Sequence, residues 1–127
     1  MSIPNAKRPD EFADLAAEAI RSLNHLTIGG TGYREAHEVD AVIAHLMATV
    51  HGMEQSIAHV MRWLHAAYDG GRLAHDADLD LKASITQVSD ALMRSGARLD
   101  RLDDGLNDVR RVTAHLKTIT PGKGTEH

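Results

Sequence analysis

The stretch "AHEVDAVIAHLMATVHGMEQSIAHVMRWLHAAY", residues 36–68, decides the fold class. Apolar residues recur along it in alternating steps of three and four positions, which is the spacing of one side of a helix. The members of this apolar stripe are Ala36, Val39, Ile43, Leu46, Val50, Met53, Ile57, Val60, Leu64 and Ala67. The spacing predicts one long helix over residues 32–68.

A second apolar stripe follows a turn. The turn, "DGGRLAHDAD" at residues 69–78, combines helix-breaking glycines with aspartates that suit the start of a helix. The members of the second stripe are Leu81, Ile85, Val88, Leu92, Ser95, Leu99, Leu102, Leu106, Val109, Thr113 and Leu116. This stripe predicts a helix over residues 79–119. A short turn between two long helices makes them antiparallel neighbours.

A shorter helix is predicted over residues 9–26. Pro9 suits a first helical turn, because its missing N–H has no partner there in any case. The glycine-rich segment "TIGGTG", residues 27–32, ends this helix. We expect it to run back over the end of the hairpin that lies far from the turn.

These patterns together predict an all-α protein with a single helical domain over residues 9–119. The expected architecture is a long antiparallel hairpin, similar to a coiled coil, plus the shorter N-terminal helix. Residues 1–8 and 120–127 are expected to form a flexible arm and a flexible tail.

The half of the hairpin near its turn has too few helices to cover its apolar stripes. We therefore expect a homodimer that completes a helical bundle. The residues expected at this interface are Met53, Ile57, Val60, Met61, Leu64, Leu81, Ile85, Val88 and Leu92. The function expected from this pattern is a non-enzymatic module for protein–protein interaction and assembly, with itself and with another protein as candidate partners.

The composition excludes several classes of function. The chain has 127 residues, no cysteine and a formal net charge of -4, so thiolate metal sites are absent and nucleic acid is not an expected partner. No apolar run approaches the roughly 20 residues of a membrane span. We expect a cytoplasmic protein that needs no membrane and no cofactor.

The histidines of the first long helix offer a different hypothesis. Five of the nine histidines lie there, at His37, His45, His51, His59 and His65. None has another histidine one turn away at i+4, so this helix alone makes no histidine metal site. A solvated outer face is one interpretation and a pH-responsive surface is another. A metal site at the turn, with His65, Asp69 and His75 as ligands, is the remaining alternative.

The segment "RRVTAH", residues 110–115, resembles the motif of the HEPN ribonuclease family, an arginine followed after a few residues by a histidine. Members of that family are all-helical, similar in size and often dimeric. The resemblance implies that Arg110 and His115 act together at a catalytic site in the dimer cleft. The alternative is that these residues form a basic last turn, which favours the helix dipole.

Overall fold

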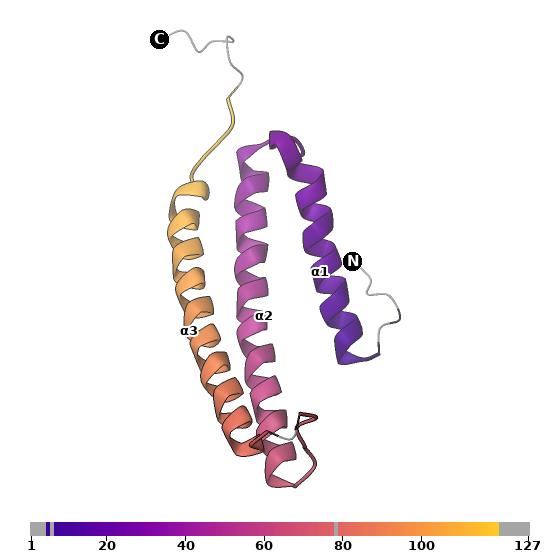
Figure 1. Ribbon diagram of the computed structural model, residues 1–127. Helices are drawn as coiled ribbons and strands as arrows, with labels where there is room; N and C mark the ends of the chain where they lie inside the picture. Colours follow the sequence, from indigo (N-terminus) through magenta and orange to yellow (C-terminus); the bar gives the residue numbers. More distant parts are fainter. Residues whose placement is uncertain (1–4, 6, 78, 120–127) are drawn as a thin grey trace. The chain divides into compact units, whose positions relative to one another are not determined.

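The computed structural model describes residues 5, 7–77 and 79–119 (Figure 1). Every regular element among these residues is helical, which confirms the predicted all-α class. The elements are α1 (Pro9–Thr27), the short 3-10 helix η1 (Ile28–Gly30), α2 (Ala36–Asp69) and α3 (Leu81–Thr113). None of the helices in the described part combines the length and hydropathy needed to cross a lipid bilayer. The predicted tail lies outside the described residues, as does most of the predicted arm.

Residue contacts divide the chain into two units, Met1–Glu35 and Ala36–His127. In the first unit, α1 begins where the sequence predicts. The side chain of Glu11 accepts a hydrogen bond from the backbone N–H of Arg8, at 3.0 Å, which satisfies one of the free donors at the helix start. None of the residues of α1 is buried, and Phe12 and Leu26 expose 45% and 65% of their surface.

The second helix begins at Ala36, four residues later than the sequence pattern predicts. The reason lies in Gly32, whose φ of 95° is outside the helical range. A side chain there is also excluded, because a Cβ at Gly32 would lie 2.5 Å from the carbonyl oxygen of Leu26. The acceptor for the first N–H of α2 comes from a residue distant in the sequence. The N–H of Ala36 donates to the hydroxyl of Thr118 at 2.7 Å.

The third helix is shorter than predicted at both ends, Leu81–Thr113 rather than residues 79–119. It starts late because Asp80 is its N-cap, and the carboxylate of Asp80 accepts the N–H of Lys82 at 3.1 Å. After Thr113 the backbone forms a tighter turn, in which the N–H of His115 bonds to the carbonyl of Val112, three residues earlier. The chain must leave the helix here for the hydroxyl of Thr118 to reach the start of α2.

In the second unit, α2 and α3 lie side by side and antiparallel, joined by the turn after Asp69 (Figure 1). Only Val50 and Ala67 are buried among the described residues. The two predicted stripes are therefore only partly covered by the contact between the helices. The members of the stripes that expose 40% or more of their surface are Met53, Val60, Val88, Leu102, Val109 and Leu116.

Candidate interaction surface

One flank of the hairpin is held by polar contacts between α2 and α3. Near the open end, Arg110 donates to both carboxylate oxygens of Asp40, from Nε at 3.1 Å and from Nη2 at 3.0 Å. The hydroxyl of Thr113 donates to the same carboxylate at 2.7 Å. The hydrogen bonds from Arg110, and then that from Thr113, hold the pKa of Asp40 below its ordinary value. A bidentate contact of this kind between an arginine and a carboxylate fixes the relative position of the two helices.

A second polar contact joins the middles of the two helices. Nε2 of His51 lies 2.9 Å from Oδ1 of Asp103, an oxygen that is buried and has no further partner among the described residues. The interaction with Asp103 raises the pKa of His51, and the charges of Glu54 and Asp100 act in the same direction. The carboxylate of Asp103 therefore favours the protonated imidazole.

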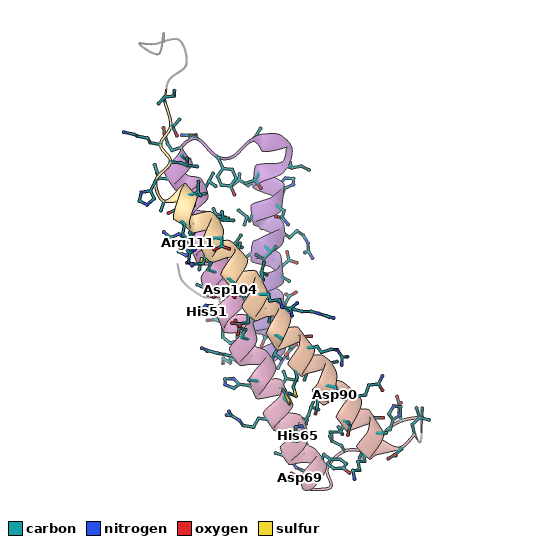
Figure 2. All side chains as sticks on the ribbon, turned by 90° about the vertical axis from the view of Figure 1, so that its left-hand side faces the viewer. His51, His65, Asp69, Asp90, Asp104 and Arg111 are labelled. Carbon is teal, nitrogen blue, oxygen red and sulfur yellow. The ribbon has the colours of Figure 1, made fainter. Side chains whose placement is uncertain are left out.

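A third polar contact lies near the turn, where the Nε2 of His65 and the hydroxyl of Ser89 are 2.8 Å apart. His65 is closer to the turn than His51 on α2 (Figure 2). The three pairs run in opposite order along the two helices, as an antiparallel hairpin requires. We call this side, with its pairs Asp40–Arg110, His51–Asp103 and His65–Ser89, the polar flank.

The opposite flank of the hairpin is apolar. Each α3 residue of the polar flank follows an apolar residue directly, and one step along a helix turns a side chain by about 100°. Val88, Leu102 and Val109 therefore point away from the polar contacts, toward the other side of the groove between the helices. We call this side the apolar face; its exposed members are Met53, Val60 and Trp63 on α2, and Val88, Leu102, Val109 and Val112 on α3.

Most of the apolar face is uncharged. Its rows on α2 and α3 include many small or hydroxyl-bearing residues between the larger ones, among them Thr49, Ser56, Ala91 and Gly105. The charged residues in or beside these rows are Arg98, Arg101 and Asp108, and the guanidinium of Arg72 lies 5.8 Å from the centroid of the Trp63 ring. A face of this composition can approach another helix closely without burying unpaired charge.

The nine residues predicted at the dimer interface fall into two groups in the hairpin. Met53, Val60 and Val88 are exposed on the apolar face. The other six are partly covered, consistent with a role in packing α2 against α3; they are Ile57, Met61, Leu64, Leu81, Ile85 and Leu92. The exposed group is therefore the better place to test an interface without disturbing the hairpin.

The two residues of the HEPN-like motif have different surroundings. The guanidinium of Arg110 is engaged by Asp40 across the hairpin. His115 lies beyond the end of α3 and is exposed. Arg110 thus has a structural partner within the hairpin.

The residues of the alternative metal site make separate contacts. His65 bonds to Ser89, whereas the Nδ1 of His75 accepts the N–H of Ala77 at 3.0 Å. Asp69, the last residue of α2, is exposed (Figure 2). Within the residues that the structure describes, no three histidine or carboxylate side chains are grouped closely enough to hold a metal ion.

The comparisons with known proteins leave the interpretation to the structure itself. No family model, no curated protein and no solved structure matches the chain.

Sequence reasoning missed a basic stripe beside the apolar face. Arg94, Arg98 and Arg101 are exposed on α3, and none of them has an ion-pair partner in the described part of the chain. Arg101 directly precedes Leu102 of the apolar face, and Arg94 and Arg98 lie seven and three residues before Arg101, on the same edge of the helix. This spacing is visible in the sequence. Its meaning depends on which side of α3 faces α2.

Proposed function

We propose that this protein is a non-enzymatic assembly module that dimerises through the apolar face of its α2–α3 hairpin. The observation that carries the proposal is the exposure of Met53, Val60, Val88, Leu102 and Val109, each between 40% and 50%. They belong to two apolar stripes that run along both long helices. A pair of helices that exposes such a surface gains stability when another apolar surface covers it.

A second copy of the chain suits this surface better than a small ligand does. The apolar face extends along both helices of the hairpin, and a long shallow stripe matches another helical hairpin in length and shape. Two hairpins related by a two-fold axis would form a four-helix bundle in which both stripes face the interior. Most of this face is uncharged, so the desolvation cost that opposes the packing is small. A cytoplasmic location stays a prediction from the sequence.

The test is the mass of the protein in solution after a charge is placed on the apolar face. Each chain weighs 13.8 kDa, and we expect the natural sequence to scatter light as a dimer at pH 7.5. Val60→Asp and Val88→Asp should each produce a monomer, because a carboxylate would have to be buried without a partner. Both residues are already exposed in the hairpin, at 50% and 40%, so the fold of each variant should survive.

A matched variant controls for the added charge. Ala58 is exposed on α2 and lies two residues before Val60. This spacing turns its side chain by about 200° from that of Val60, away from the apolar face. Ala58→Asp should remain a dimer, and circular dichroism should show unchanged helix content in all three variants. A natural protein that is a monomer at every concentration, or dimers that persist in both valine variants, would contradict the proposal.

A further inference from the structure

The charges beside the apolar face restrict how two hairpins can pack through it. Two symmetric arrangements bring apolar faces together. In the first, the two turns lie at the same end and α3 of each copy packs on α2 of the other. In the second, the turns lie at opposite ends, α3 packs on the α3 of the partner and α2 on its α2.

The second arrangement brings like charges together. When the two faces overlap fully, the two-fold axis passes near the midpoint of α3, which is Ala97 within Leu81–Thr113. Arg94, Arg98 and Arg101 surround this midpoint. They would therefore meet the same three arginines of the other copy. Asp90 and Asp104, which border the stripe at four residues before Arg94 and three after Arg101, would likewise meet each other across the axis. Like charges placed opposite each other across an interface oppose that mode of packing.

The first arrangement places the basic stripe against a neutral edge. Along the hairpin, the stripe lies between Asp103 and Ser89, whose partners on α2 are His51 and His65. A two-fold axis along the hairpin keeps each residue at its own level, so the stripe meets the stretch of α2 between these two histidines in the other copy. The residues of that stretch that border the apolar face are Gly52, Ser56 and His59.

The formal charges of that stretch of α2 lie elsewhere on the helix. Glu54 lies toward the polar flank, where its charge acts on His51. Arg62 follows Val60 by two residues, which turns it by about 200° from the apolar face. Neither of them meets the basic stripe.

We propose that the two hairpins of the dimer pack with their turns at the same end, α3 of each copy lying on α2 of the other. This inference rests on the proposed dimer and specifies its geometry. The pairing makes the edge at His59 the surface that faces the arginines of the other copy. It also makes the assembly a closed two-fold dimer with both turns presented on one end.

A single spin label measures the geometry directly. The chain has no cysteine, so Ala74→Cys in the exposed turn gives one labelling site per copy. At pH 7.5 we expect a distance between labels of about 20 Å, the width of two packed helices. A distance of about 50 Å, the length of a 34-residue helix, would overturn the same-end packing and leave the proposed dimer standing. No dipolar coupling, together with a monomer mass, would overturn both.

A charge variant tests the same geometry by affinity. His59→Glu places a carboxylate beside the arginines of the other copy twice in each dimer, and should tighten the dissociation constant by about fivefold at low salt. The gain should disappear when Arg98→Gln is added. Ala58→Glu is the matched control, because position 58 is exposed on α2 but is turned by about 100° from position 59, away from the apolar face. This change should leave the dissociation constant unchanged. An unchanged dissociation constant in His59→Glu would contradict the same-end packing, because only that packing places position 59 against the arginines of the partner's α3.

Discussion

At the residue scale, the polar flank shows how three pairs of side chains set the register of two helices. Asp40 accepts hydrogen bonds from Arg110 and Thr113, and both donors come from α3. A slip of α3 by one residue would break this contact and the contact between His51 and Asp103 at once. The hydrophobic stripe repeats along each helix and tolerates several registers, whereas these pairs occur once.

The interaction between His51 and Asp103 predicts a pH dependence of stability. The pKa of His51 is raised above 6.5 in the folded protein, first by its contact with Asp103 and then by the charge of that carboxylate. The contribution is therefore fully present below pH 6.5 and is lost as the pH rises through the folded pKa. Urea denaturation should show that the natural protein is more stable than His51→Gln at pH 5.5, and that this advantage is smaller at pH 8.5.

The control for this prediction is His37→Gln, on the same helix. His37 is exposed and makes no ion pair with the described residues, so its replacement should change stability equally at the two pH values. An advantage over His51→Gln that stays constant with pH, or one that grows as the pH rises, would show that Asp103 does not stabilise the charged imidazole.

At the scale of the elements, the start of α2 depends on a residue that follows the end of α3. Helix starts leave several N–H groups without partners inside the helix, and these are usually satisfied by a residue just before the helix. Here Thr118, 82 positions along the chain from Ala36, provides the oxygen. The contact closes the open end of the hairpin, opposite the turn.

Removal of the Thr118 hydroxyl should therefore destabilise the hairpin. Thr118→Val keeps the shape of the side chain and should lower the free energy of unfolding by about 1 kcal/mol, the usual cost of losing an N-terminal cap. Thr118→Ser retains the hydroxyl and should lie close to the natural protein in chemical denaturation. A loss in Thr118→Ser with no loss in Thr118→Val would assign the effect to the methyl group instead of the hydrogen bond.

At the scale of the whole molecule, the described residues bury little apolar surface. Among the described residues only Val50 and Ala67 are buried, in a chain whose composition is 43% hydrophobic. The proposed dimer would add to the stability of this folded state by mass action.

Stability should therefore rise with protein concentration. If folding and dimerisation are coupled, each tenfold increase in concentration adds about 1.4 kcal/mol to the apparent free energy of unfolding of the dimer. The thermal midpoint, followed by circular dichroism over a hundredfold range of concentration, should increase for the natural protein. Val60→Asp should show a midpoint independent of concentration. A constant midpoint for the natural protein would mean that the hairpin is stable without a partner.

The sequence by itself determined the helical class and the approximate places of the helices. Apolar residues at steps of three and four, with Pro9 at one helix start and glycines at the breaks, are local signals, and local signals act without knowledge of the partner surface. The helix ends were less accurate. Gly32 takes a positive φ, and the first N–H of α2 bonds to Thr118. The first helical residue of the hairpin is therefore Ala36 instead of residue 32, and the last is Thr113 instead of residue 119.

Only the tertiary structure decided which side of each stripe faces the other helix. Val88 and Ser89 are neighbours in the sequence, as are Leu102 and Asp103, and the repeat alone favoured the apolar member of each pair for the contact with α2. In the hairpin the polar members turn toward α2 and contact His65 and His51. The rotation of α3 about its own axis decides which member of each pair contacts α2. That rotation depends on interactions between residues far apart in the sequence, so the apolar face and its basic edge became visible only when the two helices were packed together.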